Sequence, residues 1–177
     1  VNVSQRLVDV AAEIGAELEL TPIGSTHLIT RIRELEAEGN DVPIAGEGNG
    51  GVMFPDYRIA RDGAYTAARF LGLLADRPAS EVVAEYSDYT MVRKNVEYSD
   101  EDERAAMLEA AESHARDADA ELTTLDGYRL DYGDAWVLAR PSGTEPLVRL
   151  YAEARTETRA ETLLESFHDA IVAGSTD

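Results

Sequence analysis

The sequence predicts an α/β region followed by an α+β region within 177 residues. In residues 1–78, segments of helical period alternate with short apolar runs, which predicts a partial three-layer domain with a mostly parallel sheet. In residues 79–177, short strand patterns are joined by Asp-Gly and Gly-Asp turns, which is typical of an antiparallel sheet with helices on one face. A Pro, a short helical piece and Ser-Asp separate the two patterns, so we expect a domain boundary near residue 78.

The first region contains three predicted helices and two short predicted strands. Ser4 can cap the first helix and Gly15 can end it, while the second helix ends near Gly39 and Asp62 opens the third. The positions expected on the buried faces are Leu7, Val10, Ala11 and Ile14 in the first helix, Leu28, Ile32 and Leu35 in the second, and Ala64, Ala67, Leu71 and Leu74 in the third. The expected strands are residues 17–20 and 42–45.

The second region contains five predicted strands and two main helices. The expected strands are residues 89–98, 121–125, 128–132, 135–139 and 147–154. Asp100 and Glu103 fit a capping box at the start of an acidic helix. The inner face of that helix is expected to carry Leu108, Ala111 and Ala115, and a last helix is expected over residues 159–173.

The composition is strongly acidic, with a formal net charge of −19. Such a surface repels nucleic acid and anionic lipid, so we expect neither as a partner. Only Lys94 among the 16 basic residues is a lysine. Acid enrichment with scarce lysine resembles the cytoplasmic proteins of salt-loving archaea, in which salt screens the repulsion between like charges. The alternative is an ordinary acidic protein.

The sequence has no cysteine, which excludes disulfides and thiolate chemistry and favours a cytoplasmic location. No apolar run approaches the 18 or so residues of a membrane span, so we expect no membrane partner. The chain begins Val-Asn-Val-Ser without a Met, which indicates a fragment of a longer protein.

A loop between two predicted strands carries the clearest functional signal. Arg140 and Arg149 flank the segment P-S-G-T-E-P, in which Ser142 and Thr144 offer hydroxyl groups. Two arginines around a small-residue loop in so acidic a protein predict an anion site, most simply for a phosphate. The alternative is a tight turn with two solvated arginines.

A second loop, G-E-G-N-G-G at residues 46–51, follows the predicted strand 42–45. Its glycines leave Glu47 and Asn49 as the only functional side chains, and a carboxylate beside an amide suits the hydroxyl groups of a diol. Loops at the carboxyl ends of parallel strands commonly bind ligands. The alternative is a flexible surface loop, since the pattern is not a dinucleotide fingerprint.

Three segments together resemble the C-terminal half of the α-D-phosphohexomutases. T-P-I-G at residues 21–24 resembles the family's T-x-V-G turn. The 46–51 loop followed by R-D-G at 61–63 resembles the G-E-x-S-G-H sugar-binding loop and the helix after it. The segment 126–153, with D-G-Y-R-L and W-V-L-A-R-P-S-G-T-E-P-L-V-R-L-Y-A-E, resembles the final domain almost end to end.

The resemblance implies an isomerase of phosphomannomutase or phosphoglucomutase type, which moves a phosphoryl group between the 1- and 6-positions of a hexose phosphate. The family uses a phosphoserine in its first domain, a Mg²⁺ loop in its second and a hexose bisphosphate intermediate. This sequence contains no matching serine loop or metal loop, so the resemblance implies domains three and four only, with no catalytic or metal-binding residue in the chain. The partners it implies are the hexose phosphate and the two N-terminal domains of the same protein.

By position, the resemblance assigns Glu47 and Asn49 to the sugar hydroxyls. It assigns the phosphate to the loop and its flanking arginines: Arg140, Ser142, Gly143 through its N–H, Thr144 and Arg149. Gly51 stands where many members carry a His, and Ser25 where some bacterial members carry one, which leaves the preferred hexose open. The alternatives are a phosphoglucosamine mutase and a sugar-phosphate-binding module without catalysis.

Overall fold

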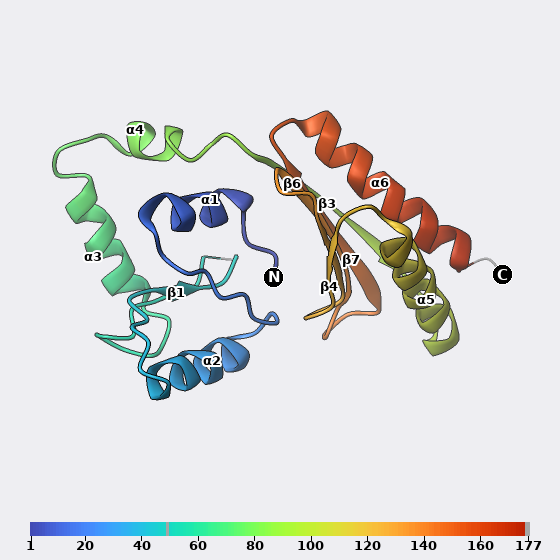
Figure 1. The fold of residues 1–177 in the computed structure, drawn as a ribbon, viewed down its shortest axis with the longest axis horizontal. Coiled ribbons are helices and arrows are strands. Elements are labelled where there is room, and N and C mark those ends of the chain that lie inside the picture. The colour runs from blue at the N-terminus through green and yellow to red at the C-terminus, as the bar shows by residue number, and fades with distance from the viewer. Residues whose placement is uncertain (49, 176–177) are drawn as a thin grey trace. The chain divides into compact units, whose positions relative to one another are not determined.

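The computed structural model describes residues 1–48 and 50–175, which form two compact units (Figure 1). Unit 1 consists of Val1 and residues 18–87, and unit 2 consists of residues 2–17 and the chain from residue 88 onward. The units therefore separate between residues 87 and 88, and the first helix packs with unit 2. The domain boundaries 1–78 and 79–177 stay a prediction.

Unit 1 has a small core and little sheet. Its elements are α2 (Ser25–Ala37), β1 (Ala45–Gly46), β2 (Val52–Met53), α3 (Gly63–Leu73) and α4 (Ala79–Ala84). As predicted, α2 buries Leu28 and Ile32, which pack against Met53. The helix ends where Asn40 donates its N–H to the Leu35 carbonyl at 2.9 Å.

The parallel sheet expected in the first region does not form among the described residues. β1 and β2 pair antiparallel, with Ala45 opposite Met53. A parallel pair needs a crossover of about a dozen residues or more, whereas only residues 47–51 connect these strands, so the chain returns as a hairpin. The predicted strand at residues 17–20 is also absent, because no described strand lies beside it to supply hydrogen bonds.

Helix α3 begins as predicted, since the Asp62 carboxylate accepts the Tyr65 N–H at 2.9 Å. Its predicted buried face is wrong for the described residues: none of its residues is buried, and Leu71 is 66 % exposed. An apolar helix face is buried only where a second layer covers it. In unit 1 the described strands total four residues, too few to provide that layer.

Unit 2 is built on a five-stranded antiparallel sheet, as the sequence predicts. Its strands are β3 (Thr90–Glu97), β4 (Glu121–Thr123), β5 (Tyr128–Asp131), β6 (Ala135–Pro141) and β7 (Leu147–Ala154), in the order β3-β7-β6-β5-β4. Helices α5 (Glu101–Asp117) and α6 (Glu157–Gly174) lie on the same face of this sheet (Figure 1). The α+β class of the second region is confirmed.

The two faces of the sheet have different chemistry because side chains alternate along a strand. On β7, Val148, Leu150 and Ala152 are fully buried in the core beneath the helices, which also contains Phe167 of α6. The residues between them, Arg149 and Tyr151, project from the opposite face. The sheet thus provides a packed apolar side and a side that carries polar groups.

The start of α5 follows the predicted capping box, except that the Glu103 carboxylate binds Ser99 instead of the Asp100 backbone N–H. Asp100 accepts the Glu103 N–H at 2.9 Å, whereas the Glu103 carboxylate reaches back to Ser99, accepting its N–H at 2.6 Å. The hydrogen bonds from Ser99 hold the pKa of Glu103 below its usual value.

Of the helices in the described chain, none combines the length and apolar character that crossing a membrane requires.

Helix α1 (Gln5–Ile14) forms where predicted, and the Ser4 hydroxyl accepts the Arg6 N–H at 3.2 Å. Its predicted buried face is wrong in part, since Leu7 and Ile14 are exposed. Within unit 2, the N-terminal end of the helix contacts the five-stranded sheet instead. There the backbone N–H of Gln5 donates to the buried Glu153 carboxylate, which also accepts the Trp136 Nε1–H at 3.0 Å.

Candidate functional site

The hairpin of β6 and β7 places the two predicted arginines opposite each other. Arg140 is the register partner of Arg149, so both side chains leave the same face of the sheet. Like charges directly opposite are destabilising in a sheet. A pair of this kind is therefore costly to the fold unless negative charge lies close to the two guanidinium groups.

Each arginine has a carboxylate partner nearby. Arg140 Nε lies 3.2 Å from Asp126 Oδ2, and both side chains are mostly buried. Arg149 forms an ion pair with the exposed Glu145 carboxylate. A hydrogen bond with Tyr151, followed by the charge of Glu145, raises the pKa of Arg149 above its usual value, so this side chain stays cationic.

The Nε atoms of Arg140 and Arg149 are buried and lack a hydrogen-bond partner among the described residues. The approach of Arg140 to Asp126 is close enough for an ion pair but lacks the direction of a hydrogen bond. Buried polar groups in folded proteins are normally satisfied, so these two donors on adjacent strands are available to an acceptor ligand. The buried Nε of Arg129 also lacks a partner among the described residues, so the signal of this site is the opposition of the two arginines rather than the unsatisfied atoms alone.

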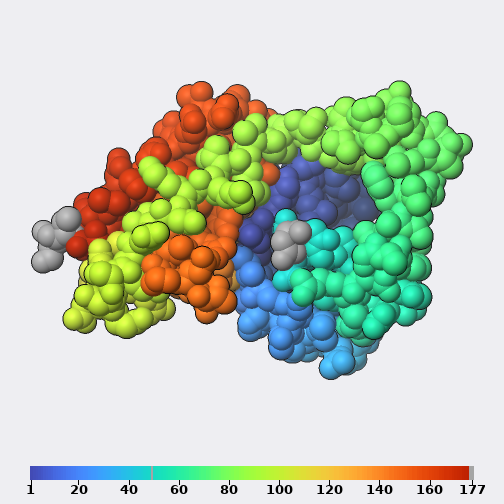
Figure 2. Space-filling view, turned by 180° about the vertical axis from the view of Figure 1, so that it is seen from behind, coloured from blue at the N-terminus to red at the C-terminus, as the bar shows by residue number. Residues whose placement is uncertain are grey.

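The connection between the strands is held by Ser142. Its hydroxyl oxygen accepts the N–H groups of Thr144 at 3.4 Å and Glu145 at 3.2 Å. Its backbone N–H donates to the Leu147 carbonyl at 2.9 Å, which closes the turn. Gly143, Thr144 and Glu145 are exposed, and the connection (orange) lies at the surface of unit 2 in Figure 2.

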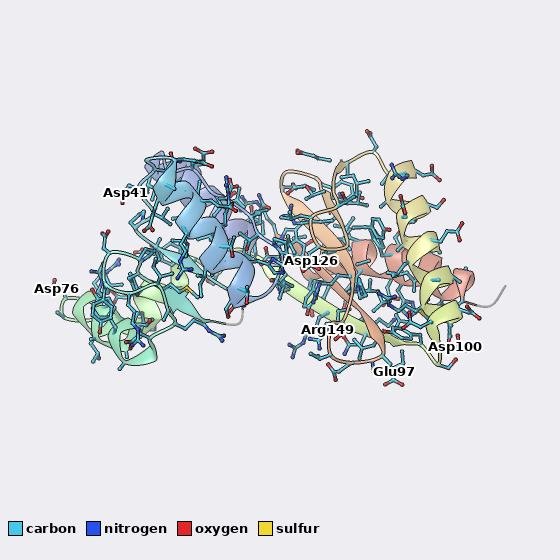
Figure 3. All side chains as sticks on the ribbon, turned by 90° about the horizontal axis from the view of Figure 1, so that it is seen from below. Asp41, Asp76, Glu97, Asp100, Asp126 and Arg149 are labelled. Atoms are coloured by element: carbon cyan, nitrogen blue, oxygen red, sulfur yellow. The ribbon has the colours of Figure 1, made fainter. Side chains whose placement is uncertain are left out.

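Asp126 is a residue of this site that sequence reasoning missed. In the sequence it marks an Asp-Gly turn and the start of the D-G-Y-R-L segment, and neither pattern gives it a role in ligand binding. Gly127 adopts a φ of +86°, and a Cβ there would lie 2.3 Å from the Ala139 carbonyl oxygen. This close approach brings Asp126 to Arg140, and Figure 3 labels Asp126 and Arg149 on unit 2. A short-range signal for it was the D-G dipeptide preceding strand 128–132.

In unit 1 the glycine loop forms the tip of the β1–β2 hairpin. The Glu47 N–H donates to the Gly51 carbonyl at 2.9 Å, and the Gly50 N–H donates to the Glu47 carbonyl at 3.0 Å. The Glu47 carboxylate accepts the Ser25 hydroxyl at 3.2 Å and Arg61 Nη1 at 3.1 Å. Glu47 is thus fixed by two donors from other segments, while Asn49 lies outside the described residues.

A hollow of about 490 Å³ lies beside this loop. Its lining combines loop residues with the start of α3, including Gly50, Gly51, Arg61, Asp62 and Thr66. Val52, Ala67 and Phe70 add an apolar part to the lining, and the volume lies in the range of small-ligand sites. The described members of the two predicted groups thus lie in different units, with Glu47 in unit 1 and the residues of the β6–β7 hairpin in unit 2.

A third cluster carries no function by itself. The ligand atoms of Glu165, His168 and Asp169 on α6 lie within 4.8 Å of one another. The two carboxylates are exposed, and Lys94 Nζ already donates to Glu165 at 3.0 Å. An exposed acidic helix face of this kind is common without a metal ion.

Two family models match nearly the whole chain. "Phosphoglucomutase/phosphomannomutase, alpha/beta/alpha domain III" matches residues 1–89, and "Phosphoglucomutase/phosphomannomutase, C-terminal domain" matches residues 94–170. A solved phosphoglucomutase/phosphomannomutase family protein from Burkholderia thailandensis has a TM-score of 0.76 at 28 % identity, and the alignment covers 95 % of this chain and 35 % of that one.

Curated archaeal proteins are similar along most of the chain. A probable phosphoglucosamine mutase of Methanopyrus kandleri is 39 % identical over 97 % of this chain. A phosphoglucomutase/phosphomannomutase of Thermococcus kodakarensis is 37 % identical over 92 % of it. The chain spans 37 % and 34 % of the length of these relatives.

These matches place the chain in a class of sugar-phosphate mutases, and the matched parts are domain III and the C-terminal domain. The chain belongs to the phosphoglucomutase/phosphomannomutase family.

Proposed function

We propose that this chain is the sugar- and phosphate-binding part of a phosphohexomutase. The full-length protein would move a phosphoryl group between the 1- and 6-positions of a hexose phosphate, through a phosphoserine and a bisphosphate intermediate supplied by regions outside these 177 residues. The observation that carries the proposal is the pair of opposed arginines, Arg140 and Arg149, with unsatisfied buried Nε atoms. The family membership supports it.

In this proposal the hairpin holds the phosphate that is not transferred. Arg140 and Arg149 supply charge-assisted donors, and Ser142, Thr144 and the Gly143 N–H supply neutral ones. The Glu47 carboxylate accepts hydrogen bonds from the sugar hydroxyls, and the Asn49 amide both accepts and donates hydrogen bonds there. Phosphoryl transfer depends on positioning and electrostatics rather than on covalent help, so an anchor at each part of the substrate contributes to catalysis without touching the reacting atoms.

The metal requirement belongs to the same proposal. We place Mg²⁺ outside this chain, because the carboxylates brought together here, Glu165 and Asp169, are exposed and partly engaged by Lys94. They do not fit a metal centre for phosphoryl transfer, which would need carboxylates free to hold the ion and would supply neutralisation of phosphate charge. No step of the reaction is assigned to residues of this chain through a metal.

Two alternatives remain, each with a discriminating result. A phosphoglucosamine mutase is favoured by the name of the Methanopyrus relative and would prefer glucosamine phosphate over mannose and glucose phosphates in steady-state kinetics. A non-catalytic binding module would bind sugar phosphates without turnover in the full-length protein. The 177-residue chain alone should bind but not interconvert glucose 1-phosphate and glucose 6-phosphate.

The test of the phosphate assignment is Arg149→Ala in the full-length protein. Loss of charge-assisted hydrogen bonds costs about 1.5–3 kcal/mol, so KM for the hexose phosphate should rise about 10- to 150-fold. Arg104→Ala is the matched control, because Arg104 pairs with Glu101 on α5 at 2.9 Å, on the helix side of the sheet. An unchanged KM with a lowered melting temperature would contradict the assignment.

We also propose that the protein works in the cytoplasm of a salt-loving cell. The support is the net charge of −19 with a single lysine. Raising KCl shortens the Debye length from about 10 Å at 0.1 M to about 3 Å at 1 M, so the melting temperature should rise across that range. A melting temperature indifferent to KCl would contradict this assignment and leave the mutase proposal intact.

A further inference from the structure

The space beside Gly51 is filled by another side chain. A Cβ built at Gly51 would lie 2.4 Å from Arg61 Cδ and 3.3 Å from Arg61 Cγ. Real Cβ atoms essentially never approach a heavy atom within 3.0 Å, so any other residue at position 51 must move Arg61. A side chain at position 51 would therefore displace the Arg61 side chain, and it is this room, rather than a left-handed backbone conformation, that distinguishes Gly51.

Arg61 uses that room to reach the loop carboxylate. Its Nη1 donates to Glu47 Oε2 at 3.1 Å, the same oxygen that accepts the Ser25 hydroxyl at 3.2 Å. The Glu47 side chain is only 13 % exposed, whereas Arg61 is 51 % exposed. Within the described part of the chain both donors use Oε2, so Oε1 keeps its capacity to accept a ligand hydroxyl.

The backbone beside Arg61 is fixed independently of the loop. Asp62 is the N-cap of α3, and its carboxylate accepts the Tyr65 N–H at 2.9 Å. Its carbonyl oxygen accepts the Thr66 hydroxyl at 2.8 Å. Arg61 therefore extends from the anchored start of a helix toward a loop whose strands are two residues long.

We propose that Arg61 is a positioning residue for ligand recognition: it holds the Glu47 carboxylate in one orientation, and the missing side chain at Gly51 leaves room for this contact beside the 490 Å³ hollow that Arg61 and Gly51 line. The ligand class is a hexose derivative with a hydroxyl directed at Glu47, so the inference rests on the proposed function of Glu47. A carboxylate ordered before binding loses less side-chain freedom when the ligand arrives.

The energetics separate this role from a structural one. An ion pair with a half-exposed partner contributes little to folding, so removing Arg61 should leave the melting temperature almost unchanged. The loss should appear in ligand binding, because Glu47 then samples several orientations. A residue that only stabilised the hairpin would lower the melting temperature and leave KM as it was.

The test is a double-mutant cycle in the full-length protein, with KM and kcat for the preferred hexose phosphate measured for Gly51→Ala, Arg61→Ala and the double variant. Each single variant should raise KM about tenfold with little change in kcat, which corresponds to about 1.4 kcal/mol. The double variant should be no worse than either single one, because both remove the same contact. Arg61→Lys should recover part of the loss, since it keeps one charged donor.

Two further variants make the outcomes distinguishable. Arg58→Ala is the control, because Arg58 is exposed and pairs with Asp62 at 3.6 Å rather than with Glu47. Glu47→Ala reports on the underlying function: if it leaves KM unchanged, the sugar-binding role of Glu47 is wrong. If Glu47→Ala raises KM but Arg61→Ala does not, or if the two losses multiply in the double variant, the positioning role of Arg61 is overturned.

Discussion

The β6–β7 hairpin, which we propose to bind phosphate, and the glycine loop at residues 46–51 are built in different ways. The hairpin strands lie inside a five-stranded sheet, and Val148 and Leu150 on its reverse face are completely buried. The glycine loop joins two strands of two residues each, beside a core of three buried side chains. The hairpin therefore takes its geometry from sheet register, and the loop takes it from side-chain contacts with Ser25 and Arg61.

This difference predicts which site can change its ligand easily. Strand register is fixed by a whole buried face, and a slip of one residue would turn every apolar side chain outward. In the proposed function the opposed arginines therefore accept one kind of ligand, an anion. The Glu47 carboxylate is oriented by two individual contacts, so one substitution at position 25, 51 or 61 can alter what it recognises.

The largest expected effect is a difference in hydrogen exchange between the sheet of unit 2 and helix α3 of unit 1. Amides in the densely packed sheet, such as Leu150, should exchange only on global unfolding, whereas those of α3, such as Leu71, should exchange through local opening. We expect a difference on the order of a thousandfold or more, since the two limits differ by several kcal/mol. Similar protection of α3 and β7 in the 177-residue chain would break the comparison.

Two glycines of unit 2 test how far the geometry of the β6–β7 hairpin depends on close backbone contacts. Gly127→Ala should destabilise the chain by about 1–3 kcal/mol, because alanine is strained at a φ of +86° and its Cβ would meet the Ala139 carbonyl at 2.3 Å. Gly143→Ala is the matched control: no described atom lies within 4 Å of a Cβ there, and the change keeps the N–H. Denaturant unfolding should show a loss only for Gly127→Ala, with phosphate affinity retained by Gly143→Ala.

The pH dependence of unit 2 gives a smaller effect. Hydrogen bonds from Arg116 and then Tyr128 hold the pKa of Glu112 below its usual value of 4.5. A lowered folded-state pKa contributes stability above pH 4.5, and this contribution is lost as the pH falls through the folded-state value. Glu112→Gln should therefore flatten the fall of the melting temperature in acid. Glu109→Gln on the same helix should keep the wild-type slope, and equal slopes for both variants would contradict the prediction.

The smallest effect is expected at the exposed partner of Arg149. Glu145 competes with an anion for this guanidinium, and an exposed pair of this kind is worth about 0.2–1 kcal/mol. Glu145→Gln should therefore tighten binding of inorganic phosphate up to about fivefold, measured by titration calorimetry. Weaker binding would indicate that Glu145 contributes to the ligand site instead of competing with it.

The sequence by itself determined the local elements and singled out the residues that we propose to bind an anion. Helical period and capping residues predicted α1, α2, α3, α5 and α6, and turn dipeptides predicted the antiparallel strands of unit 2. These features depend on residues a few positions apart, so they can be derived without knowing the rest of the fold. The loop between Arg140 and Arg149 was likewise recognisable, because its two arginines border one short turn.

Only the tertiary structure decided which side chains meet. The register that sets Arg140 opposite Arg149, the approach of Asp126 to Arg140, and the reach of Arg61 past Gly51 to Glu47 all follow from how the chain returns on itself. The same holds for α1, which was expected to bury Leu7 but instead buries Gln5 against Glu153. Local period fixes which face of an element is apolar, but contacts between distant segments decide what that face, and the polar groups beside it, finally touch.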